Sequence, residues 1–168
     1  MRLPQSLQMS EVARYAAICL VLVTSSGVYQ LADAKGQNAT SFKVDLGTYM
    51  AAEPAGWDGS TALPAAVYFH GWQSTAKAVM NNEAMRQSFS RAGVLLIAPD
   101  GLHKTWAHNG SPAHRFPDKR DEIAFVDQVL LDVKARWPVD ERRLWATGFS
   151  QGGSMVWDAP WASNQLRH

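Results

Sequence analysis

The sequence predicts an α/β fold in which helices cover both faces of a mainly parallel sheet. Three short apolar runs have the composition of buried strands, at Leu63–Phe69, Val94–Ala98 and Arg142–Thr147. Two longer segments with helical spacing of apolar residues, Ala76–Ala92 and Asp121–Trp137, lie between them. Buried strands that alternate with helices at short spacing are typical of βαβ units, whose parallel strands are covered on both faces.

The segments around these runs predict a further strand and the connecting loops. Ser41–Tyr49 alternates apolar and polar residues with a period of two, which predicts a half-exposed strand. Glu53–Thr61 is rich in Gly, Pro, Asp and Ser and predicts a loop. Gly93 ends the first helix, and Pro99–Gly101 is a turn signal after the second buried run. His103–Pro117 is polar and predicts a surface loop.

The second helical segment has the clearest periodicity in the chain. Asp121 and Glu122 lie at its N-terminal end, where the helix dipole favours negative charge, and Pro138 ends it. Its apolar stripe consists of Ile123, Val126, Val129, Leu130, Val133 and Trp137.

Length and composition predict one globular domain and exclude a nucleic-acid-binding surface. The chain has 168 residues, of which 46% are hydrophobic and 18% charged. Its formal net charge is +1, and no stripe of Lys and Arg with interleaved aromatic residues is present. The seven Trp residues fit a large core, and they fit a carbohydrate- or aromatic-binding surface as well.

Residues 1–34 predict a secretory signal peptide that is cleaved after residue 34. Arg2 and Arg14 precede an apolar stretch at Tyr15–Val23, and Ala32–Ala34 supplies small residues at the cleavage site. The stretch is too short to span a bilayer, so we expect a secreted chain without membrane association after cleavage. An amphipathic or disordered N-terminal arm is the alternative. Cys19 lies in this segment, which leaves the mature chain without cysteine.

Gly148-Phe149-Ser150-Gln151-Gly152 has the form of a nucleophile elbow. In that motif a strand turns sharply into a helix, and small residues two before and two after the Ser allow its strained backbone to clear its neighbours. The motif follows an apolar run and precedes a helical segment, Gln151–Trp157. Ser150 is therefore the candidate nucleophile, and a glycine-rich turn without catalytic role is the alternative.

His70-Gly71-Trp72 follows the first buried run, where a loop that binds an oxyanion is needed. Acyl transfer requires two fixed N–H donors for the negative oxygen of the tetrahedral intermediate. The residue after the nucleophile supplies one and the earlier loop the other. We therefore expect the backbone N–H groups of Gln151 and Trp72 to form the oxyanion hole, with His70 and Gly71 supporting the loop.

Several blocks of the chain together resemble the secreted esterases that include polyhydroxybutyrate depolymerases and feruloyl and acetylxylan esterases. The blocks are His70–Trp72, Ala98–Gly101, Arg120–Val126, Trp137–Asp140 and Ala146–Gly153, and the resemblance covers roughly Phe42–Met155. It implies an α/β-hydrolase fold, no metal or organic cofactor, and cleavage of carboxylic esters through an acyl-serine intermediate. The implied substrates are polyesters or feruloylated and acetylated polysaccharides.

The same resemblance implies an acid and a histidine later in the chain than Ser150. After Ser150, Asp158 is the only acidic residue and His168 is the only histidine. Asp158 lies about two helical turns from Ser150, on the order of 12 Å. We therefore expect residues 35–158 to be the N-terminal part of a hydrolase domain without its C-terminal strands. Residues 159–168 predict an irregular tail, with the helix ending at Pro160. The open edge of Arg142–Thr147 predicts self-association.

The remaining histidines and tryptophans allow competing interpretations. His103, His108 and His114 match no metal-binding spacing, so they predict loop residues and no metal site. Asp100 and Asp118 are expected to be loop or capping residues. A non-catalytic fragment or a polymer- or glycan-binding module, with a groove lined by Trp72, Trp106 and Trp157, is the rival to the esterase. A thioesterase or peptidase on the same scaffold is a third possibility, and the sequence does not identify the ester.

Overall fold

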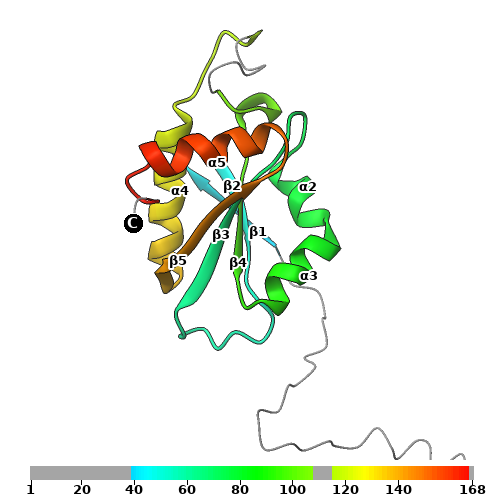
Figure 1. Ribbon diagram of the computed structural model, residues 1–168, viewed down its shortest axis with the longest axis vertical. Coiled ribbons are helices and arrows are strands. Elements are labelled where there is room, and N and C mark those ends of the chain that lie inside the picture. The colour runs from blue at the N-terminus through cyan, green and yellow to red at the C-terminus, as the bar shows by residue number, and fades with distance from the viewer. Residues whose placement is uncertain (1–38, 108–114, 167–168) are drawn as a thin grey trace, which may run out of the picture. The chain divides into compact units, whose positions relative to one another are not determined.

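The computed structural model describes residues 39–107 and 115–166, whose strands form one sheet of five in the order β1-β2-β4-β3-β5 (Figure 1). Strands β4, β3 and β5 are parallel, whereas β2 is antiparallel to both β1 and β4. The predicted α/β class is confirmed, with a mixed sheet. The elements in chain order are β1 (Thr40–Val44), β2 (Gly47–Ala52), β3 (Leu63–Phe69), α2 (Ala76–Asn81), α3 (Glu83–Arg91), β4 (Leu95–Pro99), the 3₁₀ turn η2 (Leu102–Lys104), α4 (Glu122–Arg136), β5 (Val139–Gly148) and α5 (Gln151–Ala162).

The central parallel strands agree with the predicted buried runs. β3 has the predicted bounds, and every residue of β4 is buried. Because each strand is covered on both faces, apolar residues are needed at successive positions rather than at alternate ones. This explains why a continuous apolar run marks these strands in the sequence.

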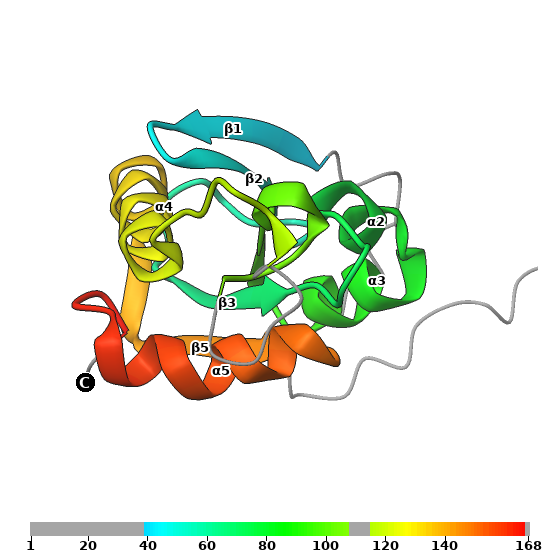
Figure 2. The same ribbon diagram turned by 90° about the horizontal axis from the view of Figure 1, so that it is seen from above.

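Helices pack on both faces of the sheet, as predicted. On one face, side chains of α4 and α5, such as Phe125 and Met155, pack against Phe69 and other residues of β3 and β4. On the other face, Val79 and Met80 of α2 pack against β2 and β4. Figure 2 shows α4 on one side of the sheet and α2 and α3 on the other.

The single strand predicted at Ser41–Tyr49 was wrong, because this segment is a hairpin. Its two strands pair from Thr40 with Ala51 to Val44 with Gly47. The alternation of apolar and polar residues continues across the turn, so the pattern does not reveal the reversal. The turn is held from outside the segment, since Gln128 of α4 accepts a hydrogen bond from Leu46 N–H at 3.0 Å.

The single helix predicted at Ala76–Ala92 was also wrong, because α2 and α3 are separated at Asn82. Asn82 has extended backbone angles, φ −76° and ψ 92°, and its side chain accepts a hydrogen bond from Met85 N–H at 3.1 Å. It therefore caps the N-terminus of α3, a role that asparagine performs well.

The prediction that Pro160 ends the last helix was wrong, because α5 continues to Ala162. A proline removes one helical N–H donor, but later N–H groups can still bond, as Ser163 N–H does to Ala159 O at 2.8 Å. Ser163 Oγ also bonds to Asp127 of α4, so this part of the predicted irregular tail is ordered. The signal peptide in residues 1–34 lies outside the described residues and stays a prediction.

β5 begins at Val139, before the predicted start at Arg142, and β3 is its one strand neighbour in the part of the chain that the structure describes. Its other edge is therefore open there, as expected from the sequence. Association of two copies through this edge stays a prediction.

Candidate active site

Ser150 lies on the bend between β5 and α5, with φ 53° and ψ −119°. L-residues rarely adopt these backbone angles, so the surrounding contacts must hold them. The helix begins immediately, because Gly152 N–H and Gly153 N–H donate to Phe149 O and Ser150 O at 2.9 and 2.8 Å. Ser150 is exposed, and its Oγ forms no hydrogen bond with any residue in 39–107 or 115–166. Strand, bend and helix thus follow in the predicted order.

The two glycines of the motif permit close backbone approach around this bend. A Cβ atom at position 152 would lie 2.0 Å from Phe69 O, and one at position 148 would lie 2.6 Å from Gly152 O. Real Cβ atoms do not come this close to backbone. The spacing of the glycines in the motif is therefore a steric requirement of the bend.

The loop after β3 lies directly against the bend. A Cβ atom at Gly71 would lie 3.3 Å from Phe149 O and 3.6 Å from Ser150 Cβ. In the described part of the chain, the N–H groups of Trp72 and Gln151 have no hydrogen-bond acceptor. The structure thus places two free amide donors in the segments that flank Ser150.

His70 ties the loop after β3 to the loop after β4. Gly101 N–H donates to His70 Nε2 at 2.9 Å, so the ring proton is on Nδ1, which donates to Gly71 O at 2.8 Å. Burial lowers the pKa of His70, and its backbone bond to Gly71 opposes that shift in part. A neutral ring makes both bonds, whereas a protonated ring would lose the bond from Gly101 N–H. The structure thus places His70 as a bridge within the loops.

Thr105, which the sequence patterns did not mark, contacts the residue after Ser150. Its Oγ1 lies 2.7 Å from Gln151 Nε2 and 3.0 Å from Gln151 Oε1. Gln151 Nε2 also donates to Trp106 O at 3.4 Å. Thr105 is buried, which is unusual for a polar residue in a loop and shows that these contacts replace water.

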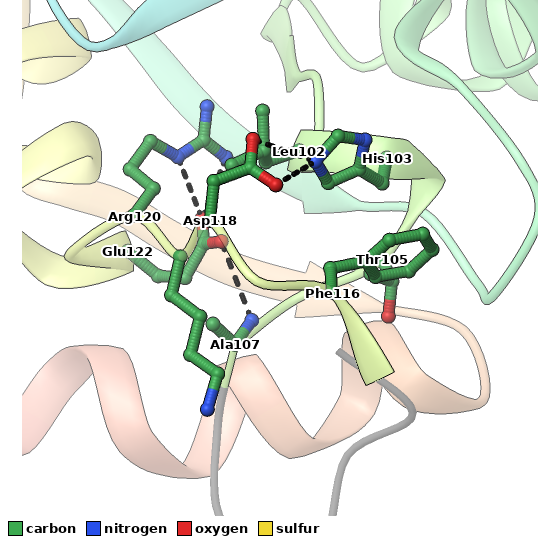
Figure 3. Close-up of a pocket in the computed structure, with 9 residues that line it drawn as sticks. Leu102, His103, Thr105, Ala107, Phe116, Asp118, Arg120 and Glu122 are labelled. Atoms are coloured by element: carbon green, nitrogen blue, oxygen red, sulfur yellow. Dashed lines mark hydrogen bonds and ion pairs between the residues drawn. The ribbon is translucent and has the colours of Figure 1, made fainter. Parts of the chain in front are cut away.

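A second cluster of polar residues lines the pocket shown in Figure 3. His103 Nε2 lies 2.9 Å from both carboxylate oxygens of Asp118, and the ring of Phe116 stacks on His103 at 4.4 Å. The hydrogen bond from His103 holds the pKa of Asp118 below its usual value. His103 is thus engaged with Asp118 and forms no bond to Ser150. His108, His114 and His168 lie outside the described residues.

A buried ion pair lines part of this pocket. Arg120 Nη2 lies 2.6 Å from Glu122 Oε2, and both side chains are almost fully buried. Arg120 also donates to Leu46 O at 3.1 Å and to Asp100 O at 2.9 Å. Burial raises the pKa of Glu122, and the neighbouring guanidinium opposes this shift. Arg120 thus joins the β1–β2 turn, the end of β4 and the start of α4, a link that the sequence did not predict.

The exposed aromatic side chains only partly match the groove predicted for a binding module. Trp72 is 50% exposed and Trp157 is 76% exposed, but Trp106 is fully buried. The indole of Trp106 donates to His70 O at 2.8 Å and packs edge-on against Phe69. Trp106 therefore cannot line a surface groove. Phe149, next to Ser150, is instead exposed at 69%.

Asp100 makes a structural contact with the start of α2. Asp100 Oδ1 accepts from Ala76 N–H, the first amide of α2, at 2.6 Å, which confirms its capping role. Within residues 39–107 and 115–166, no group of His, Cys, Asp and Glu side chains could hold a metal ion. No helix in the same residues is long and apolar enough to cross a membrane.

Sequence comparison identifies a distant relative among esterases. No protein-family model matches the chain. "Probable feruloyl esterase C" of Aspergillus clavatus is 28% identical over 112 residues, which are 64% of this chain and 38% of that protein. The chain thus spans well under half the length of this relative.

Structural comparison identifies the fold. The S-formylglutathione hydrolase of Agrobacterium tumefaciens has a TM-score of 0.55 and 16% identity, over 73% of this chain and 51% of the hydrolase. A ferulic acid esterase has a TM-score of 0.58 and 13% identity, over 77% of this chain and 56% of the esterase. The chain therefore has the α/β-hydrolase fold, is distantly homologous to feruloyl esterases, and corresponds to part of their length.

Proposed function

We propose that this chain provides the nucleophile and the oxyanion donors of a carboxylic-ester hydrolase. One observation carries the proposal: the exposed Ser150 lies on a strained bend against the loop at Gly71, and the N–H groups of Trp72 and Gln151 in these segments have no acceptor among the described residues. Backbone strain held at one exposed serine is typical of a nucleophile. The distant homology to feruloyl esterases supports the same chemistry.

In the proposed reaction, Ser150 Oγ forms a bond to the carbonyl carbon of the ester and transfers its proton to a general base. The carbonyl electron pair moves to oxygen, and the N–H groups of Trp72 and Gln151 stabilise that negative charge. When the carbonyl re-forms, the alcohol leaves with a proton and the acyl group remains on Ser150. Water then repeats the two steps and releases the acid. None of the histidines among the described residues bonds to Ser150, so the proposal assigns no residue as that base.

We propose esters of polysaccharides or polyesters as the substrate class. The name of the Aspergillus clavatus relative supports a feruloylated substrate. Trp72 belongs to the oxyanion loop, Phe149 directly precedes Ser150 in the sequence, and both rings are exposed. Such rings can stack on a sugar or an aryl group, which also supports this substrate class. Such substrates are extracellular, so the proposal includes export through residues 1–34.

A fluorophosphonate probe tests the nucleophile directly, because it phosphonylates an activated serine and leaves a mass that identifies the residue. We expect one adduct on the unmodified chain, none on Ser150→Ala, and one on the control Ser154→Ala, which removes a serine from the same end of α5. Equal labelling of Ser150→Ala, or no labelling of the unmodified chain, would contradict the proposal. Because no histidine among the described residues bonds to Ser150, we expect slower labelling than in a full-length feruloyl esterase.

A non-catalytic binding module is the second candidate, favoured by the lack of a histidine partner for Ser150 in the described residues. It predicts measurable affinity for xylan or a polyester film without release of acid. Ser150→Ala would leave that affinity unchanged, whereas Trp72→Ala would lower it. Hydrolysis that is lost in Ser150→Ala would decide against this candidate.

A further inference from the structure

The loop formed by residues 101–106, here called the 101–106 loop, contacts both segments that carry the oxyanion donors. We infer that this loop sets the spacing between the N–H groups of Trp72 and Gln151, and that Thr105 is the positioning residue that acts on Gln151. The inference rests on the proposed function, because it assigns a role within the same site.

The 101–106 loop has a backbone that only specific contacts can maintain. A Cβ atom at Gly101 would lie 2.4 Å from Thr105 O, so the loop folds back on itself at a glycine. His103 and Lys104 both have positive φ, 54° and 62°, which L-residues other than glycine rarely adopt. Strained backbone persists where surrounding structure holds it, and it occurs preferentially at functional sites.

One side of the loop holds the segment with Trp72. Lys104 O accepts a hydrogen bond at 2.8 Å from Gln73 N–H, the residue directly after Trp72. Gly101 N–H and the Trp106 indole donate to the ring and the carbonyl of His70 at 2.9 and 2.8 Å. His70, two residues before the first donor, and Gln73, one residue after it, are therefore both bound to this loop.

The other side of the loop holds the residue that carries the second donor. Gln151 has no long-range backbone bond to the loop, so its side chain makes the connection, through Thr105 Oγ1 and Trp106 O. Thr105 is buried, and its hydroxyl meets both ends of the Gln151 amide. Without that hydroxyl, the Gln151 amide would keep only the long bond to Trp106 O, at 3.4 Å.

The two sides together explain why a loop that contributes no donor affects oxyanion binding. An oxyanion hole works when its donors stand ready at a fixed separation, so that no reorganisation is needed during the reaction. A displacement of about 1 Å in such a group can cost on the order of 100-fold in rate. Thr105 therefore affects the acylation rate through Gln151, without touching the substrate.

Thr105→Val tests this inference, because valine keeps the shape of threonine and removes the hydroxyl. We expect the rate constant for acylation of Ser150 by p-nitrophenyl acetate, followed by intact mass, to fall about 10- to 100-fold. The half-saturating ester concentration should stay within about 2-fold, since the donors act mainly on the transition state. Thr105→Ser, which keeps the hydroxyl, should restore most of the rate. Thr61→Val is the control for the substitution itself, because Thr61 precedes the N-terminal end of β3, whereas the loop with Trp72 follows the C-terminal end.

A double-mutant cycle separates positioning from a general loss of packing. Gln151→Met removes the side-chain amide and keeps the backbone N–H, so it should reduce acylation as Thr105→Val does. The double variant should then be no slower than the slower single variant, because both changes break one connection. Additive losses would overturn the inference.

Hydrogen–deuterium exchange provides a readout that needs no reaction. Thr105→Val, but not Thr105→Ser, should accelerate amide exchange in peptides that cover residues 70–74 and 149–153. If the unmodified chain is not acylated but exchange responds in this way, the proposed nucleophile fails and the structural role of Thr105 stands. Unchanged exchange in Thr105→Val, or unchanged acylation in a chain that reacts, would overturn the inference.

Discussion

Gly152→Ala should destabilise the fold, whereas Gly153→Ala, one residue further along α5, should stabilise it. A Cβ atom at 152 would lie 2.0 Å from Phe69 O and 2.8 Å from His70 O, and ordinary van der Waals contact begins near 3.4 Å. Apart from its chain neighbours and the backbone of its own helix, no atom lies within 4 Å of a Cβ atom at 153. The two positions thus receive the same added methyl group in opposite surroundings.

The magnitude follows from two opposing terms. Alanine in place of glycine within a helix contributes about 0.5–1 kcal/mol, because it restricts the unfolded chain and favours helix. Overpacking costs about 1–3 kcal/mol, and here the upper part of that range applies, because the contacted atoms are backbone and cannot rotate away. We expect Gly153→Ala to gain about 0.5–1 kcal/mol and Gly152→Ala to lose about 1–2.5 kcal/mol net.

Urea unfolding followed by circular dichroism measures both values on the same chain. In thermal unfolding, each kcal/mol corresponds to roughly 2–4 °C in Tm for a chain of this length. Gly148→Ala serves as a second variant, because its Cβ would lie 2.6 Å from Gly152 O. If Gly152→Ala were as stable as Gly153→Ala, the close approach of α5 to Phe69 would be refuted, together with the steric explanation of the motif.

Three further changes test the contacts around the site. Arg120→Met should lower the free energy of unfolding by about 3–5 kcal/mol, because it leaves Glu122 buried without a cation, and adding Glu122→Leu should recover much of the loss in urea unfolding. Burial lowers the pKa of His70 in the folded chain below 6.5, the value that applies to the unfolded chain. Between these two pKa values the unfolded chain therefore binds more protons than the folded chain. Stability should therefore be full above pH 6.5 and decrease as the pH falls below it, and His70→Asn should show a smaller decrease in urea midpoints measured at pH 8 and pH 5.5. Asn82→Ala should cost about 0.5–2 kcal/mol through loss of the α3 cap, measured by the same unfolding assay.

Local sequence patterns predicted the elements whose causes are local. The bounds of β3 follow from an apolar run, and those of α4 follow from its periodicity, its Asp121 cap and Pro138. The bend at Ser150 was predictable because its glycines are required by sterics at fixed spacing. The spacing that marks each feature is local, although the carbonyl that Gly152 must clear, Phe69 O, belongs to another strand.

The features that sequence patterns missed depend on distant partners. Thr105 and Gln151 are 46 residues apart, and no period or spacing links them. The β1–β2 turn is held by Gln128 and Arg120, which lie far along the chain. Trp106 lies in a polar stretch that suggests exposure, yet the carbonyl of His70 satisfies its indole and allows full burial.

The location of the candidate site follows from the register of two strands. β3 and β5 are parallel and paired as far as Phe69 and Gly148, so the residues that follow each strand emerge at the same edge of the sheet. Phe69 O accepts a hydrogen bond from Phe149 N–H at 3.2 Å and is the atom that a Cβ at Gly152 would strike. This carbonyl therefore fixes how closely the bend approaches the loop after β3. Strand register alone brings Ser150 beside Gly71, whereas the separation of the two amide donors also requires the 101–106 loop, which no strand pairing specifies.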